Sequence, residues 1–142
     1  MRSCFLTAAM VLGAACTDSL PCSNCPAMEG TYAFTWQAPT TNVTGCSRLT
    51  TPRPSMLTFN RVGSSLTSSL DGQELRGTLF DTYDFTLSGG VDIASNLRGR
   101  LVTGSDAGAI RLTGTLRTSL GVADAGLGHR CDYEEKFVAD KL

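Results

Sequence analysis

The sequence predicts an all-β domain, because three features recur after residue 30. Apolar residues alternate with polar ones along the chain, and turn-forming residues divide this alternation into short segments. A Leu-x-Gly-x-Leu pattern also repeats in the second half of the chain. The segments number about eight and are joined by short connections, which favours a small antiparallel up-and-down β-barrel, with a two-sheet β-sandwich as the alternative.

The first predicted strands each carry an apolar face. Tyr32, Phe34 and Trp36 alternate with smaller or polar residues, which predicts a strand whose aromatic face packs in the core. The inward residues of the next two strands are Leu57 and Phe59, then Leu66, Ser68 and Leu70 before a turn at Asp71 and Gly72. Turns this short join antiparallel neighbours.

The Leu-x-Gly-x-Leu pattern marks three further strands, at residues 75–79, 97–101 and 112–116, with a shortened form at residues 87–89. The last strand is predicted over residues 129–138. A glycine on the inward face gives up side-chain packing, but it lets a strand coil sharply or lets a large neighbour approach the backbone. Both uses are typical of a small closed barrel.

Arginines and threonines occupy the face opposite the leucines. The arginines on this face are Arg76, Arg98, Arg100, Arg111 and Arg117. They predict a hydrated outer surface around a dry interior. A lipid-facing exterior is excluded, since each arginine would cost roughly 2 to 4 kcal/mol near the midplane of a bilayer.

The beginning of the chain predicts export. Arg2 gives a positive start, residues 5–12 form a short apolar run, and small residues lead into Cys16. An apolar run of this length is too short to cross a hydrocarbon core of ~30 Å as a helix. We therefore expect residues 1–15 to be a cleaved signal peptide.

The segment Leu12-Gly13-Ala14-Ala15-Cys16 resembles the cleavage site, or lipobox, of bacterial lipoproteins. Gly13 stands where that class carries a large aliphatic residue, and Leu12 lies one position earlier. The resemblance implies that Cys16 is diacylated and anchors the protein to a membrane, in the periplasm or at the cell surface. The alternative is ordinary cleavage at the small residues Gly13 and Ala15, followed by secretion. Residues 16–30 are predicted to be a tether, and residues 31–142 the barrel domain.

Cysteine parity supports lipidation. Cys4 leaves with the signal, and a lipidated Cys16 leaves an even number of thiols. The remaining cysteines are Cys22, Cys25, Cys46 and Cys131. In an oxidising compartment we expect two structural disulfides, with Cys22–Cys25 and Cys46–Cys131 as the favoured pairing. Alternatives are a zinc site that adds His129 and Cys131 to the first pair, and a redox-active Cys22–Cys25 dithiol.

Composition argues against several function classes. The net charge of −1 carries no basic surplus for nucleic acid. His129 is the single histidine, and no serine stands in the Gly-x-Ser-x-Gly context of a nucleophile. We therefore predict no enzymatic activity, no cofactor and no bound metal.

Glu135 is the one position where the separation of apolar and polar faces fails. If Tyr133 and Phe137 face inward, Glu135 does too. A carboxylate inside a barrel is paired, hydrogen-bonded or near an open end. Glu135 and Tyr133 are thus candidate ligand contacts at the mouth of the barrel, and the alternative is a rim residue or a partner of an arginine.

Together these features predict a monomeric, lipid-anchored, non-enzymatic protein of the cell envelope whose barrel binds a small apolar ligand. A second hypothesis is an anchored or secreted interaction module with a filled core. Such a module would contact another envelope protein or a polymer through its arginine and threonine face. An enzyme is the third and weakest hypothesis.

Overall fold

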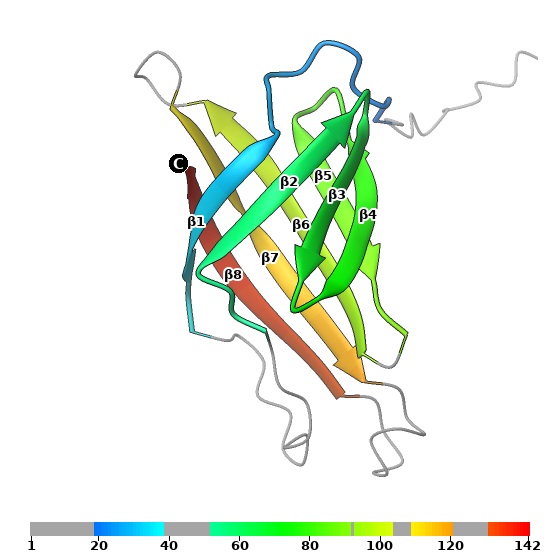
Figure 1. The fold of residues 1–142 in the computed structure, drawn as a ribbon, viewed down its shortest axis with the longest axis vertical. Helices are drawn as coiled ribbons and strands as arrows, with labels where there is room; N and C mark the ends of the chain where they lie inside the picture. Colours follow the sequence, from blue (N-terminus) through cyan, green and yellow to red (C-terminus); the bar gives the residue numbers. More distant parts are fainter. Residues whose placement is uncertain (1–18, 39–51, 92, 104–108, 121–130) are drawn as a thin grey trace, which may run out of the picture.

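The computed structural model describes residues 19–38, 52–91, 93–103, 109–120 and 131–142. The strands of this part of the chain form one closed antiparallel barrel whose spatial order follows the sequence (Figure 1). They are β1 (Gly30–Trp36), β2 (Met56–Val62), β3 (Ser65–Leu70), β4 (Gln73–Leu79), β5 (Asp84–Gly89), β6 (Ile93–Thr103), β7 (Ile110–Leu120) and β8 (Cys131–Lys141). The last strand pairs with the first to close the barrel, with Trp36 opposite Phe137. The predicted up-and-down barrel is confirmed.

The last strand extends further than the sequence predicted. β8 runs to Lys141 rather than ending at Val138, because the alternation continues through its final residues. Ala139 is fully buried, and Asp140 points outward to an ion pair with Arg111. Residues 129 and 130, the predicted start of the strand, lie outside the described part of the chain.

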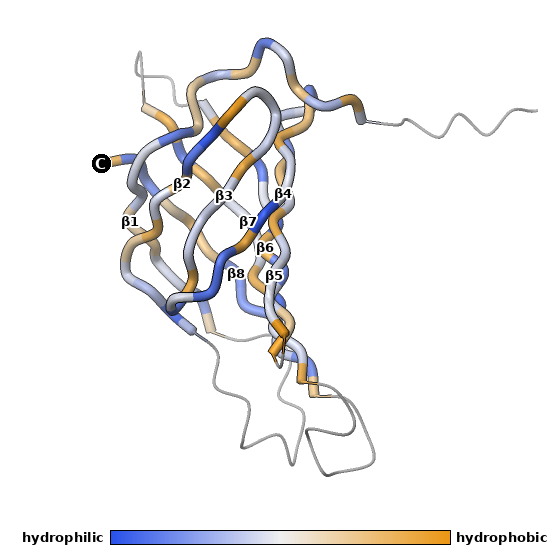
Figure 2. Tube along the Cα trace, turned by 45° about the vertical axis from the view of Figure 1, so that its right-hand side comes forward, coloured by the Kyte–Doolittle hydropathy of each residue, from blue (hydrophilic) through white to orange (hydrophobic). Residues whose placement is uncertain are grey.

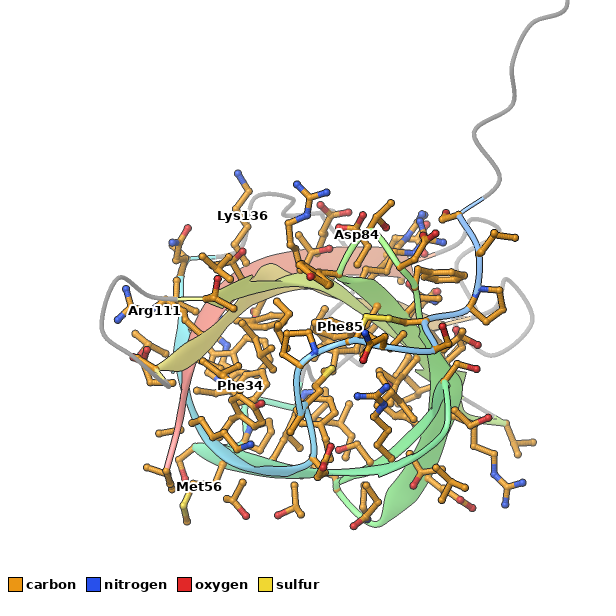
Figure 3. The ribbon with its side chains drawn as sticks, turned by 90° about the horizontal axis from the view of Figure 1, so that it is seen from above. Phe34, Met56, Asp84, Phe85, Arg111 and Lys136 are labelled. Atoms are coloured by element: carbon orange, nitrogen blue, oxygen red, sulfur yellow. A yellow bond between two sulfur atoms is a disulfide. The ribbon has the colours of Figure 1, made fainter. Side chains whose placement is uncertain are left out.

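Side chains alternate between a dry interior and a hydrated exterior, as predicted. In Figure 2 apolar and polar residues alternate along the strands. In the view from above, Phe34 and Phe85 point into the barrel, whereas Asp84, Arg111 and Lys136 point away from it (Figure 3). The alternation therefore separates a single hydrophobic core from a shell of charged residues.

Aromatic rings fill the middle of the barrel. Phe34 stacks against Phe59 with 6.4 Å between ring centroids and lies 4.8 Å from Phe137. Phe59 in turn meets Phe85 edge-on at 6.0 Å and Tyr32 at 5.5 Å. The aromatic face predicted for the first strand thus belongs to the core, and rings from β1, β2, β5 and β8 meet at the barrel axis.

Two inward glycines allow the barrel to coil tightly. Gly99 on β6 and Gly114 on β7 are cross-strand partners. A Cβ atom added at Gly99 would lie 2.7 Å from the ring of Phe85, and one at Gly114 would collide with the backbone carbonyl of Arg98. The close approach predicted for these glycines is confirmed, since an aromatic ring occupies the space that a side chain would need.

Residues 20–28 lie across one end of the barrel (Figure 1). The backbone N–H of Cys22 donates to the carbonyl of Leu79 at 2.9 Å, and that of Asp81 donates to the carbonyl of Leu20 at 2.9 Å. Met28 is fully buried in the core. The described part of the predicted tether is therefore a cap on the barrel rather than a spacer, because Met28 and backbone pairing fasten it.

Side chains from the barrel hold this cap from both sides. The hydroxyl of Tyr32 donates to the carbonyl of Met28 at 3.0 Å. The ammonium of Lys141, at the end of the last strand, donates to the carbonyl of Ala27 at 3.0 Å. The first and last elements of the barrel thus both bond to the cap.

The cap contains a disulfide between Cys22 and Cys25, whose Cα atoms lie 5.8 Å apart. This bond confirms the first predicted pairing. Cys131, at the opposite end of the barrel, is 1% exposed and also disulfide-bonded. Its predicted partner Cys46 lies outside the described residues, as does the lipidation site Cys16.

None of the described residues belongs to a helix long and apolar enough to span a membrane.

Candidate functional site

The end of the barrel opposite the cap holds a buried ion pair. Glu135 projects inward from β8 and is 1% exposed. The guanidinium of Arg53 reaches it from the segment before β2, and its Nε donates to both carboxylate oxygens at 2.9 and 3.1 Å. A second guanidinium nitrogen, Nη2, donates to Oε1 at 2.6 Å. Both oxygens of the carboxylate are therefore bonded to one arginine.

Neighbouring backbone bonds position Arg53. The indole N–H of Trp36 donates to the carbonyl of Pro54 at 2.9 Å, and the backbone N–H of Phe34 donates to that of Ser55 at 2.8 Å. The segment is thus fastened to β1 next to Glu135. The hydrogen bonds to Glu135, and then its negative charge, raise the pKa of Arg53 above its usual value.

The sequence predicted the inward direction of Glu135, and the structure places it there. Of the alternatives considered, pairing with an arginine is the one that is observed. The arginine itself was missed, because Arg53 lies 82 residues earlier in the chain and stands between two prolines, outside any alternating pattern. The one sequence feature that could have indicated Arg53 was its position shortly before a predicted strand.

Tyr133 also lies on the inward face of β8, opposite Thr118 on β7. It packs on a small cluster formed by Leu120 and Cys131. Thr118 is fully buried, and its hydroxyl has no hydrogen-bond partner among the described residues. The structure therefore brings both candidate ligand contacts to one end of the barrel, beside a buried polar atom.

The chemistry of this end is limited. Glu135 is committed to a charged partner by three hydrogen bonds, so it offers no ready base. Within the described residues, no group of three or more histidine, cysteine or carboxylate side chains is arranged to hold a metal ion. His129 lies outside these residues. The arrangement closes the barrel with a charge pair.

A second candidate site lies on the outer surface of strands β5 to β8. A hollow of about 570 Å³ is lined by small hydroxyl and amide side chains together with a few charged ones. Its main lining residues are Ser88, Asn96, Arg98, Thr115, Arg117 and Glu134. A neighbouring hollow of about 520 Å³ is more apolar and includes Phe80, Gly99 and Gly114.

Ion pairs distinguish one arginine of this surface from the others. Four outward arginines of β4, β6 and β7 each pair with a carboxylate, at N–O distances of 2.7 to 3.1 Å: Arg76 with Glu74, Arg100 with Asp84, Arg111 with Asp140, and Arg117 with Asp132. Arg98 is exposed and has no ion-pair partner within the part of the chain described. It lines both hollows. An unpaired guanidinium therefore lies where the two hollows meet.

Comparison with models of known protein families, with curated protein sequences and with solved structures found no match. The class of protein is therefore defined by the fold and the two candidate sites alone. It is a small, disulfide-containing, eight-stranded antiparallel β-barrel.

Proposed function

We propose that this chain is an exported, lipid-anchored protein of the cell envelope that acts as a non-enzymatic binding module. Its contact surface is the outer face of β5 to β8, where two hollows meet at Arg98. Cys16 carries the anchor, in keeping with the resemblance of the first residues to a lipoprotein cleavage site.

The filled interior of the barrel is the observation that carries this proposal. Aromatic rings contact one another across the axis, and the Glu135–Arg53 pair occupies the uncapped end. A small apolar ligand would have to displace these side chains, because protein interiors are close-packed. The outer surface, in contrast, offers hollows that need no rearrangement.

The position of Ser19 supports one orientation of the module on the proposed anchor. Ser19 lies three residues after Cys16 and lines the more apolar hollow. The chain enters at the capped end of the barrel (Figure 1). An anchor at Cys16 would therefore hold the cap toward the membrane and direct the Arg53 end away from it.

The anchor is tested by Cys16→Ser in the native host. We expect this variant to leave the membrane fraction and to lose labelling by radioactive palmitate. Cys4→Ser serves as the control, since Cys4 belongs to the predicted signal peptide and should change neither result. Unchanged fractionation of Cys16→Ser would remove the lipoprotein part of the proposal.

The contact surface is tested by site-specific photo-crosslinking. A photoreactive amino acid at Thr115, inside the hollow, should yield an adduct in cells, and the same group at Thr31 on β1, which lines none of the hollows described, should not. Both threonines are partly buried and lie on strands. Equal adducts at both positions, or none at Thr115, would contradict a contact surface on β5 to β8.

A second function, a small ligand inside the uncapped end, has one observation in its favour. The hydroxyl of Thr118, near Tyr133 and Glu135, is buried without a partner among the residues that the structure describes, and such a group is normally satisfied by protein, water or ligand. Native mass spectrometry of protein purified from its own host tests this function. A retained small molecule that is lost in Thr118→Val would favour it over the surface module.

A further inference from the structure

The two outer hollows form one continuous track along β6 and β7. They share Arg98 and Thr115, which face each other in the register of these strands. The first hollow includes Asn96, and the second extends to Arg100. At about 3.3 Å per residue, the path between these two positions covers about 13 Å. A track of this length suits an extended polymer better than a compact small molecule.

The lining of the track argues against a protein as its occupant. Protein interfaces depend on aromatic and large aliphatic anchors that enter apolar pockets. The first hollow has Ala94 as its largest apolar side chain, and the rest of its lining is made of hydroxyl, amide and glycine groups with two arginines and a glutamate. The second hollow is shallow and apolar over Phe80 and the glycine backbone. Sugar rings, which have hydroxyl edges and apolar C–H faces, match this alternation of polar and apolar surface.

The charge of the track indicates an acidic occupant. The first hollow contains two arginines, Arg98 and Arg117, and one carboxylate, Glu134. Glu134 already takes part in an interaction of its own. Arg117 is paired with Asp132 and Arg100 with Asp84, so among the described residues of the track Arg98 is the arginine that has no ion-pair partner. A guanidinium binds a carboxylate through two parallel hydrogen bonds, which fixes both position and orientation.

From these three observations we propose that the track binds an acidic polysaccharide, with the guanidinium of Arg98 paired to a uronate carboxylate. Hydroxyl and amide side chains such as Thr115 and Asn96 then bond the sugar hydroxyls. This inference rests on the proposed function, because it names the occupant of the same surface.

The test uses the full-length protein in detergent and polygalacturonate as the probe. Binding is measured by isothermal titration calorimetry at low salt, with fully methyl-esterified polygalacturonate as the neutral form of the same polymer. We expect Arg98→Gln to weaken binding of polygalacturonate about tenfold or more, as a charge-assisted contact requires. Arg76→Gln, an exposed arginine of β4 outside the track, is the matched control and should leave binding unchanged.

Several results would overturn the inference. Equal binding of the methyl ester would show that the protein does not recognise a carboxylate. An equal effect of Arg76→Gln would show that binding depends on the overall charge of the surface and not on Arg98. Equal binding of polyglutamate would indicate an acidic peptide instead of a polysaccharide. If polygalacturonate does not bind while the Thr115 adduct still forms in cells, this inference fails and the proposed contact surface stands. If the adduct is also absent, both fail.

Discussion

At one end of the barrel residues 20–28 lie across the opening (Figure 1). At the other end the side chain of Arg53 bonds a buried carboxylate. The capped end is closed by two backbone hydrogen bonds, by side-chain donors of Tyr32, Arg61 and Lys141 that bond cap carbonyls, and by the buried side chain of Met28. The uncapped end is closed by side-chain charge, and it depends on the identity of two residues, Arg53 and Glu135.

This difference separates two physical ways of ending a barrel. At the cap the accepting groups are neutral backbone carbonyls, so the loss of one donor leaves no unpaired buried charge. The ion pair at the other end compensates a carboxylate that has been removed from water, and removing one partner leaves the other unpaired. The two ends should therefore respond differently to substitution.

The largest effect is expected at the cap. Met28→Ala should lower the free energy of unfolding by about 2 to 5 kcal/mol, because Met28 is fully buried and its truncation leaves a cavity. Met56→Ala is the matched control, since Met56 is 56% exposed, and its effect should stay within about 0.5 kcal/mol. Urea denaturation measures both. Similar losses in the two variants would mean that residues 20–28 do not cap the barrel.

A smaller loss is expected at the uncapped end. Arg53→Gln should lower the melting temperature, because the buried carboxyl group of Glu135 loses its charged hydrogen-bonding partner, while water reaching the half-exposed position of Arg53 limits the effect. The same substitution at Arg76, which pairs with an exposed carboxylate, should change the melting temperature little.

A double variant sharpens this result. Arg53→Gln with Glu135→Gln removes both charges, so it should recover part of the stability that Arg53→Gln loses. Calorimetric melting of the single and double variants completes the cycle. Additive losses would show that the two side chains do not stabilise the barrel as a pair.

The smallest effect concerns the hydrogen bond that joins Tyr32 to the cap. Tyr32→Phe should cost about 0.5 to 1.5 kcal/mol at neutral pH, because the carbonyl of Met28 loses its donor. Burial, and then the charge of Glu29, raise the pKa of Tyr32 from 10.0 to about 12. The unfolded chain therefore loses this proton first, and stability should fall as the pH rises from 10 to about 12.

Tyr32→Phe should lose this part of the alkaline dependence. Absorbance titration near 295 nm measures the ionisation directly, and one of the three tyrosines should titrate late in the native protein and not in the variant. A native protein in which all tyrosines titrate together would contradict a buried hydroxyl at the cap.

The sequence predicted the parts of the fold in which residue types repeat, and it did not predict the parts in which backbone groups make the contacts. Inward positions such as Leu97 and Gly99 recur with a period of two, and this alone predicted strands, core and closure into a barrel. The cap was predicted as a tether, because the groups that it offers to the barrel are mostly backbone carbonyls, which leave no trace in the order of side chains.

The two candidate sites also differ in how much of each the sequence predicted. Glu135 was found because a carboxylate interrupts an apolar face, whereas Arg53 was missed because nothing in its surroundings relates it to a strand 82 residues away. The arginine face was predicted as a hydrated surface, but the distinct position of Arg98 depends on which carboxylates lie opposite its neighbours in the register. Pairing of that kind exists only after folding.

The attachment of the cap has a mechanical consequence. A pull on the chain before Ser19 reaches the barrel through the backbone bonds of Leu20 and Cys22, which join it to residues at and after the end of β4. The disulfide between Cys22 and Cys25 links the second of these two loaded residues to the next segment of the cap, so the load bypasses the intervening loop. Tension from outside the domain would then be shared between the cap and the β4–β5 connection before it could peel β1 from its neighbours.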